Sequence, residues 1–167
     1  EQADATMLSG ETTVGKYPLK CLDVFDRIAR RIERSGGANY VEDAQLTSPR
    51  QKLVKSAVIM ANELRAEAIL VFTMRGNMAR HTGWMRPRYS QIHALCENGH
   101  VAESLSLNWG VNASVISFNH DNPEQTIELA LKELLKQKRL QPGNTIVIIS
   151  SISAGEQIVD AVQMRVV

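Results

Sequence analysis

The stretch AEAILVFTMRGNMAR, residues 66–80, contains the signals of a strand followed directly by a helix. Its first part, EAILVFT (67–73), is a short continuous apolar run, which is typical of a strand buried on both faces. The segment 75–85 predicts a short helix that ends at Arg86-Pro87. A buried strand that leads straight into a helix is one unit of an α/β fold with a parallel sheet.

The same alternation continues on both sides of this unit. Further strands are expected at 90–97, 113–118, 144–150 and 161–167, and helices from Ser48-Pro49, at 100–109 and from Asn122-Pro123. The connection 151–160 is too short for a comfortable helical crossover, so the last strand is expected to be antiparallel and at an edge. The sequence therefore predicts an α/β fold, a three-layer αβα domain with about five mostly parallel strands.

The two long helices of this domain have recognisable starts and apolar stripes. Ser48 and Asn122 are expected N-caps, each followed by a first-turn proline, and Gln125 is the expected capping-box partner of Asn122. The predicted buried positions are Leu53, Ala57, Met60, Ala61 and Leu64 in the first helix, and Ile127, Ala130, Leu131, Leu134 and Leu135 in the second.

The N-terminal part of the chain has a different character. A helical pattern runs from Lys16 to Ser35, with Leu22, Phe25, Ala29 and Ile32 at three- and four-residue steps. Gly36-Gly37 is a strong stop signal, and residues 36–48 have no clear periodicity. This stretch is therefore predicted to be a linker or domain boundary.

Composition excludes several classes of protein. The chain has 19 basic and 18 acidic residues, so a nucleic-acid or membrane surface built on overall charge is not expected. It contains no apolar run long enough to span a membrane and no signal-peptide pattern. Cys21 and Cys96 are interpreted as reduced thiols of a cytosolic protein. Because the sequence does not begin with Met, we expect it to be cut from a longer chain.

The segment TMRGNMAR, residues 73–80, is the best candidate site. In doubly wound sheets, ligands bind beyond the carboxyl ends of the strands, near helix N-termini. Thr73 ends the strand, Gly76 lets the backbone approach a ligand, and the amides near Gly76 and Asn77 would face an anion. Arg75 and Arg80 would add positive charge. The alternative is an ordinary turn with solvated arginines.

Other chemical signals are weaker. The sequence has neither GxGxxG nor a P-loop, so dinucleotide and Walker-type binding are not supported. Its four histidines lack metal-ligand spacing, and His93 is expected to be a packed residue of a strand. Ser9 and Glu11 have no local histidine that would complete a nucleophilic triad.

Several motifs resemble the pyruvate kinase family over essentially the whole chain. The segment ADATMLSGETTVGKYPLKCLDVFDRIARRIE (3–33) resembles the end of the family's catalytic barrel, with matches at Asp4, Ala5, Met7 to Thr12, Gly15, Tyr17 and Pro18. The segments 66–88, NWGV (108–111) and MRVV (164–167) resemble its C-terminal domain.

The resemblance implies a domain organisation. Residues 1–36 would be the last βα unit of a TIM barrel, 37–47 a linker, and 48–167 the C-terminal regulatory domain. Ser9, Gly10 and Glu11 would lie at the edge of the barrel's active site.

The resemblance also implies what the whole enzyme does. Pyruvate kinases transfer a phosphoryl group from phosphoenolpyruvate to ADP in glycolysis, giving pyruvate and ATP, with Mg²⁺ and usually K⁺. The family's catalytic lysine and metal ligands would lie upstream of residue 1. We therefore expect no catalytic residue, no metal site and no activity in this chain alone. Its expected partners are the rest of a pyruvate kinase chain, further copies in a homo-oligomer and a sugar-phosphate or inorganic anion effector. No nucleic acid or membrane partner is expected, and the expected location is the cytoplasm.

The match to the family's effector site is partial. The loop corresponding to residues 73–78 holds a phosphate in the family, but Arg75 replaces its usual serine and Met78 its second hydroxyl residue. The segment SAGEQIVDAVQ (153–163) lacks the Thr-Asn pair and most glycines of the family's closing loop. We expect weak, altered or absent sugar-phosphate binding. The alternatives are a free-standing anion-binding module of the same fold, or a small enzyme acting on a phosphorylated metabolite, for which no acid–base pair is present.

Overall fold

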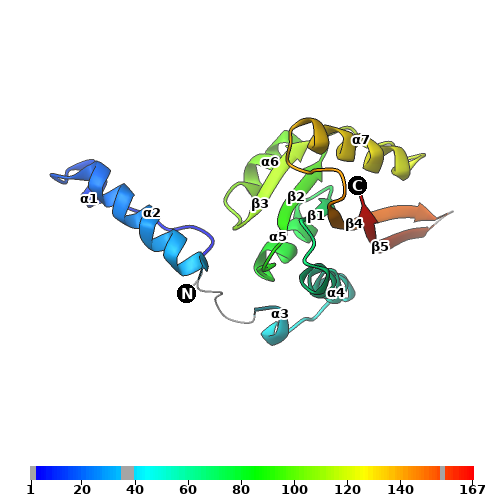
Figure 1. The fold of residues 1–167 in the computed structure, drawn as a ribbon, viewed down its shortest axis with the longest axis horizontal. Coiled ribbons are helices and arrows are strands. Elements are labelled where there is room, and N and C mark those ends of the chain that lie inside the picture. The colour runs from blue at the N-terminus through cyan, green and yellow to red at the C-terminus, as the bar shows by residue number, and fades with distance from the viewer. Residues whose placement is uncertain (1–2, 35–39, 155–156) are drawn as a thin grey trace. The chain divides into compact units, whose positions relative to one another are not determined.

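The computed structural model describes residues 3–34, 40–154 and 157–167, and of residues 152–154 and 157–158 the backbone alone (Figure 1). The chain divides into two compact units, Glu1–Asn39 and Tyr40–Val167, and each is described here by itself.

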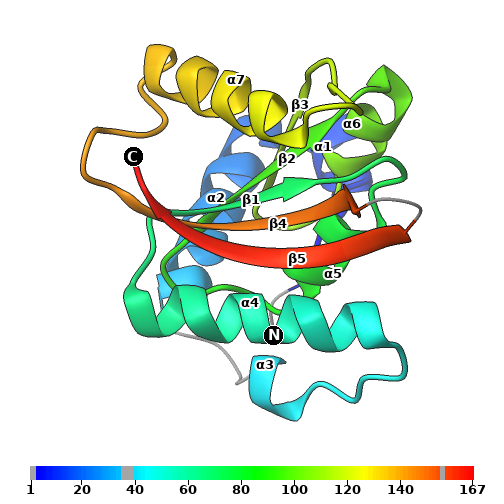
Figure 2. The ribbon, with the colours of Figure 1, turned by 90° about the vertical axis from the view of Figure 1, so that its right-hand side faces the viewer.

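The second unit is built on a five-stranded sheet with the order β3-β2-β1-β4-β5. The strands are β1 (Ala68–Phe72), β2 (Gln91–Cys96), β3 (Val111–Val115), β4 (Thr145–Ala154) and β5 (Gln157–Val166). The first four strands are parallel, and β5 pairs antiparallel with β4 at the edge. In Figure 2, β5 is the long curved strand that closes this side of the sheet. The predicted fold class and the antiparallel last strand are confirmed.

Helices cover both faces of the sheet (Figures 1 and 2). They are α3 (Tyr40–Asp43), α4 (Pro49–Leu64), α5 (Asn77–Trp84), α6 (Gly99–Leu105) and α7 (Pro123–Lys136). Ile69 and Val71 of β1 share one apolar cluster with residues of α4, α5 and α6, whereas Leu70 shares another with α7. Because successive strand side chains point to opposite faces, this alternation within β1 fixes the three layers.

The start of α4 follows the prediction, and its buried face follows it only at Ala57 and Ala61. The Ser48 hydroxyl accepts a hydrogen bond from the Gln51 amide at 3.3 Å, and the Gln51 side chain accepts one from the Ser48 amide at 3.1 Å. This is a capping box with proline in the first turn. The buried residues are Val54, Ala57, Val58 and Ala61, whereas the predicted Leu53 and Met60 are only partly buried and Leu64 is exposed. The stripe that contacts the sheet is thus rotated by about one position from the predicted one.

The predicted capping box of α7 is wrong. Asn122 makes no side-chain cap bond, and Asn119 organises the turn instead. The Asn119 side-chain oxygen accepts hydrogen bonds from the amides of Asp121 at 3.0 Å and Asn122 at 2.9 Å, and its amide group donates to Gln125 at 2.7 Å. The Asx turn therefore satisfies the Asn122 amide that the Gln125 side chain would bond in a capping box, while the Gln125 amide bonds to the Asn122 backbone oxygen.

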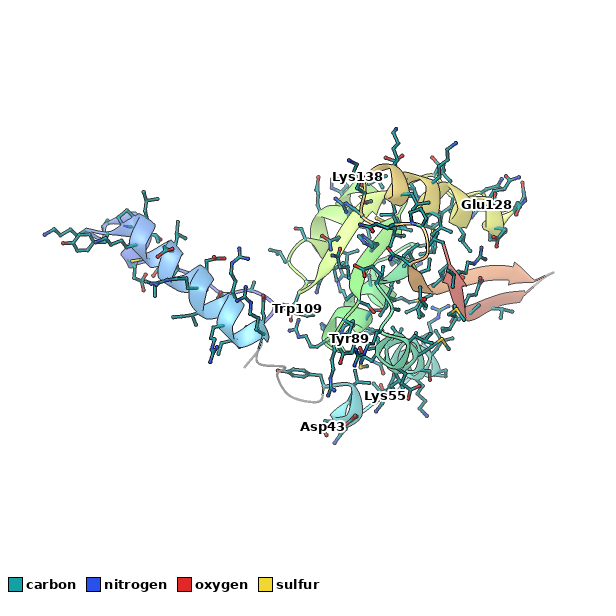
Figure 3. The ribbon with its side chains drawn as sticks, in the orientation of Figure 1. Asp43, Lys55, Tyr89, Trp109, Glu128 and Lys138 are labelled. Carbon is teal, nitrogen blue, oxygen red and sulfur yellow. The ribbon has the colours of Figure 1, made fainter. Side chains whose placement is uncertain are left out.

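The buried face of α7 agrees with the prediction. Ile127, Ala130 and Leu134 are buried, and Leu131 and Leu135 pack against the same cluster. Glu128 lies in this helix and Lys138 shortly after it, and both side chains are exposed (Figure 3).

Several element boundaries differ from the prediction. Helix α6 ends at Leu105 rather than near residue 109, β3 begins at Val111, and β4 and β5 extend into the segment that was expected to connect them. Helix α3 lies within the predicted linker and buries Val41 against the core. Gly36-Gly37 lies outside the described residues.

The first unit contains α1 (Gly10–Thr13) and α2 (Pro18–Arg34). The predicted helix at 16–35 is present, but none of its side chains is buried. Leu22 is 52% exposed and Ile28 57% exposed. Among the described residues 3–34, the apolar face of α2 therefore stays largely exposed.

We expect the backbone amides of α2 to exchange with solvent faster than those of α4. The two helices have 17 and 16 residues, but α4 buries four side chains and α2 none. Because tertiary packing supplies most of a helix's stability, α2 should open with a much smaller free energy. Hydrogen exchange on a dilute monomer measures this difference. Protection across residues 18–34 equal to that of α4 would contradict this expectation.

Candidate functional site

The candidate site lies at the carboxyl edge of the sheet, next to the point where the strand order reverses. The chain runs from β1 outward to β2 and β3, and then returns across β1 to β4. Thr73 directly follows β1, between the neighbouring strands β2 and β4. Ligands of doubly wound sheets bind at such switch points.

The turn after β1 is held by a threonine and a glycine. Thr73 is buried, and its hydroxyl oxygen accepts a hydrogen bond from the Gly76 amide at 3.0 Å. Gly76 has φ of 80° and precedes the first residue of α5. Glycine adopts this left-handed conformation without the steric cost that other residues have.

Gly76 also lies close beneath α6. A Cβ atom added to Gly76 would be 3.3 Å from Leu105 Cδ2 and 3.4 Å from Val101 Cγ1. Crowding and positive φ both select glycine at this position, as the sequence predicts for a backbone that must come close to other groups.

The Arg80 side chain folds back from α5 over the loop that follows β1. One guanidinium nitrogen, Nη1, donates to the backbone oxygen of Arg75 and to Asn77 Oδ1, each at 3.3 Å. The other, Nη2, donates to Ser104 Oγ of α6 at 2.9 Å. The Arg80 side chain therefore joins the turn, the start of α5 and α6.

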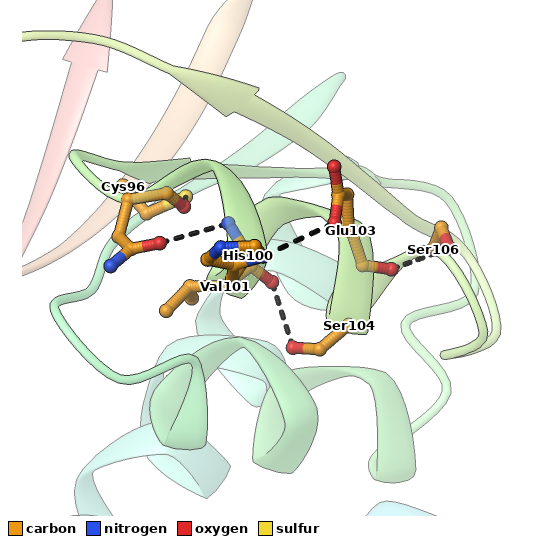
Figure 4. Close-up of polar contacts among 7 residues, drawn as sticks. Cys96, His100, Val101, Glu103, Ser104 and Ser106 are labelled. Atoms are coloured by element: carbon orange, nitrogen blue, oxygen red, sulfur yellow. Dashed lines mark hydrogen bonds and ion pairs between the residues drawn. The ribbon is translucent and has the colours of Figure 1, made fainter.

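Helix α6 presents this serine (Figure 4). Asn98 Oδ1 caps the helix by accepting a hydrogen bond from the His100 amide at 2.8 Å. The Ser104 hydroxyl donates to the backbone oxygen of Val101 at 2.8 Å, so its lone pairs are left for Arg80. The sequence did not indicate Ser104, because no local pattern relates it to a residue 24 positions earlier.

The site has the electrostatic character of an anion site. The amides of Asn77, Met78 and Ala79 begin α5, where they have no acceptor within the helix. Arg75 is exposed, and neither Arg75 nor Arg80 forms an ion pair with a carboxylate among the described residues. The Gly76 amide is used within the turn by Thr73. The donors without a described acceptor are therefore the first amides of α5 and the guanidinium of Arg75, while the Arg80 guanidinium adds its charge beside them and donates within the protein.

Two further features shape the site. Met78 is 6% exposed and belongs to the core cluster with α4, so its side chain does not line the site. Of the segment 153–163, the described residues 153–154 belong to β4 and 157–163 to β5, with Ser153 paired with Ile158 and Ala154 with Gln157. These residues therefore form paired strands where the resemblance implies a glycine-rich closing loop.

Ser9, Gly10 and Glu11 form a cluster of their own in the first unit. The Ser9 backbone oxygen accepts hydrogen bonds from the amides of Thr12 at 3.1 Å and Thr13 at 3.0 Å. The Ser9 amide donates to Glu11 Oε2 at 3.0 Å. Hydrogen bonds from the backbone amides of Glu11 and Ser9 lower the pKa of the Glu11 carboxyl. These contacts close a single polar turn before α2.

His93 is buried in β2 and is not part of the candidate site. It is 1% exposed, and its two ring nitrogens have no hydrogen-bond partner among the described residues. Burial, with a smaller effect of the Arg139 charge, lowers the pKa of His93 to about 4. The predicted packed role of His93 agrees with this position.

Other classes of site are not supported by the described residues. Cys21 and Cys96 are free thiols, and burial raises the pKa of Cys96. Within residues 3–34, 40–154 and 157–167, no group of three or more His, Cys, Asp or Glu could hold a metal ion. None of the helices described here has the length and apolar character needed to cross a bilayer.

Comparisons with known proteins agree with the fold. A family model described as pyruvate kinase, alpha/beta domain, matches residues 51–164. Pyruvate kinase isozyme G, chloroplastic, of Ricinus communis is 37% identical over 154 residues, which are 90% of this chain and 36% of the relative. Pyruvate kinase 2 of Synechocystis sp. is 30% identical over 152 residues, 91% of this chain and 25% of the relative.

The fold is also that of a solved structure. A crystal structure of a pyruvate kinase from Cryptosporidium parvum superimposes with a TM-score of 0.77 at 24% identity, covering 96% of this chain and 32% of that chain. The chain thus spans about a third or less of the length of these relatives.

Proposed function

Since the chain belongs to the pyruvate kinase family, whose alpha/beta domain it contains, we propose that it is the regulatory and oligomerisation part of such an enzyme. The whole enzyme would transfer a phosphoryl group from phosphoenolpyruvate to ADP. Residues 1–36 would contribute the last βα unit of the catalytic barrel, 37–47 the linker and 48–167 the regulatory domain. The free thiols are compatible with a reducing compartment such as the cytosol.

One observation carries the regulatory proposal, namely the geometry of the turn from Thr73 to Arg80. Its glycine is buried under α6, the first amides of α5 are open, and two arginines have no described carboxylate partner. A helix N-terminus flanked by uncompensated cations favours an anion such as phosphate. We therefore propose Thr73, Arg75, Gly76, Asn77 and Arg80 as the effector site.

The site should discriminate poorly between phosphate ligands. The Met78 side chain has no hydrogen-bond donor and is buried, and Ser153 and Ala154 pair with Ile158 and Gln157 where the resemblance implies a closing loop. Few groups remain to recognise a sugar. Calorimetric titration of fructose bisphosphate, inorganic phosphate and sulfate against the 167-residue chain tests this proposal. Sharp selectivity for the sugar phosphate at micromolar concentration would contradict it.

The edge strand β5 supports the proposed oligomer. Its outer side pairs with no other strand of the described sheet, and Val159, Met164 and Val166 are exposed. Arg165 of β5 forms a bidentate ion pair with Glu124 of α7, and Asp160 of β5 forms a single-bond ion pair with Arg50 of α4 at 2.7 Å, so this strand is tied to both helices. An ordered, open strand edge is a ready surface for a second copy of the chain.

We expect no phosphoenolpyruvate-dependent ATP formation by the 167-residue chain. The described residues offer no cluster that could bind Mg²⁺, and phosphoryl transfer depends mainly on positioning and charge neutralisation. A coupled assay with Mg²⁺ and K⁺ measures this, with a barrel-containing pyruvate kinase as the positive control. Turnover on the order of 1–1,000 s⁻¹ from a verified pure sample would show that the chain is a complete catalyst.

A further inference from the structure

We infer that Arg80 and Ser104 act together as positioning residues that hold the turn from Thr73 to Asn77 in the shape that receives an anion. The inference rests on the proposed anion site and adds a dependence on α6. Ser104 is a polar residue outside that site, and it acts through the guanidinium of Arg80.

The Arg80 guanidinium is held by acceptors within the protein. Its guanidinium donates to the Arg75 backbone oxygen, to Asn77 Oδ1 and to Ser104 Oγ. The Arg80 amide also donates to the Gly76 oxygen at 3.0 Å, which is the first backbone bond of the helix. The side chain therefore bridges the outer side of the turn, while Thr73 holds its inner side.

Ser104 fixes the direction of Arg80. The single hydroxyl hydrogen of Ser104 is donated to the Val101 oxygen, so Ser104 faces Arg80 as an acceptor only. A guanidinium has donors in a rigid fork, so fixing one nitrogen on α6 orients the other toward the turn. Without this contact, Arg80 would be free to leave the Arg75 oxygen and the Asn77 side chain.

An anion at the start of α5 needs the amides of Asn77 and Met78 to point toward the same ligand atom or group. The contacts of Arg80 with the Arg75 oxygen and with Asn77 Oδ1, here called the clamp, hold the residues on either side of Gly76. The ligand class is a small oxyanion, with inorganic phosphate as the probe. Preorganisation of this kind raises affinity because less ordering remains to be done on binding.

Two substitutions separate positioning from charge. Ser104→Ala removes an uncharged group outside the site, and Arg80→Lys keeps the charge but cannot bridge three acceptors. Each should weaken phosphate binding by about tenfold, as expected for the loss of a hydrogen bond to a charged group. Ser104→Thr keeps the hydroxyl and should restore affinity.

Ser106→Ala is the matched control. Ser106 lies just after α6, and its hydroxyl donates to the Glu103 oxygen at 2.6 Å, but it makes no described contact with Arg80. It should leave the phosphate dissociation constant unchanged. Urea unfolding of every variant measures its stability. If Ser104 had only a structural role, a loss of phosphate affinity would come with a loss of stability.

The outcomes distinguish this inference from the proposed function. If the wild-type chain binds phosphate and both Ser104→Ala and Arg80→Lys bind equally well, the positioning role is wrong. If the wild-type chain binds no phosphate, the proposed function is wrong. In that case, amide exchange at Asn77 and Met78 decides the positioning role: faster exchange in Ser104→Ala than in Ser106→Ala supports it, and equal exchange overturns it.

Discussion

Gly76→Val is expected to abolish phosphate binding by the 167-residue chain. Gly76 has φ of 80°, a conformation that a β-branched residue adopts only at a cost of about 1–3 kcal/mol. Its side chain would also approach Leu105 Cδ2 at 3.3 Å and Arg80 Nη1 at 3.4 Å. Both effects displace the turn and the clamp, so the amides of α5 lose their common direction. Calorimetry with inorganic phosphate measures the loss.

Gly110→Val is the matched control for this substitution. Gly110 has φ of 68°, but a Cβ atom there meets nothing within 4 Å. The control therefore introduces the same backbone strain without crowding the turn. It should lower the free energy of unfolding while phosphate affinity is retained. Retained affinity in Gly76→Val would show that the turn is not the binding site.

Unfolding experiments should show a loss of stability as the pH falls from 6.5 toward 4, with His93 as its main source. Burial and, to a smaller extent, the Arg139 charge lower the pKa of His93 to about 4 in the folded chain, while the unfolded value lies near 6.5. The unfolded chain thus binds a proton more readily, so stability is present above pH 6.5 and lost below it. Between pH 7 and pH 4.5 the contribution is about 2 kcal/mol. His81, whose pKa burial also lowers, adds in the same direction.

A substitution isolates the contribution of His93. His93→Leu places an apolar side chain at this buried strand position and removes two buried nitrogens without a described partner. The substitution should therefore weaken the pH dependence and stabilise the chain at pH 5. Ile92→Leu provides the control, because it changes a neighbouring buried residue of β2 without a titratable group and should leave the pH dependence unchanged. Urea unfolding at a series of pH values measures both. An identical pH dependence in wild type and His93→Leu would contradict the argument.

Short-range patterns in the sequence predict the fold well. The apolar run 67–73 and the short connection after residue 150 are local features, and each limits the topology strongly. The stripe of α4 was displaced because Leu53, Val54, Ala57 and Val58 are all apolar, so two neighbouring faces fit the same period. The predicted side-chain cap at Asn122 does not form, and the turn before α7 is organised by Asn119, which accepts from the amides of Asp121 and Asn122.

The candidate site was only partly predictable. Thr73 and Gly76 belong to one turn, so their neighbourhood follows from a strand that runs into a helix. The role of Arg80 depends on Ser104, which comes from the next βα unit and is brought close by the parallel pairing of β1 and β2. Contacts of this kind depend on side-chain direction and on the packing of two helices, which no sequence pattern encodes.

A phosphate titration followed by backbone amide resonances tests whether the turn after β1 is the effector site. We expect saturable shifts centred on Arg75, Asn77 and Met78, with sulfate giving the same pattern and fructose bisphosphate no more than a modest gain in affinity. Shifts centred on another cationic region, such as Lys136 to Arg139, or no shifts at millimolar phosphate, would contradict the assignment of this turn as the effector site.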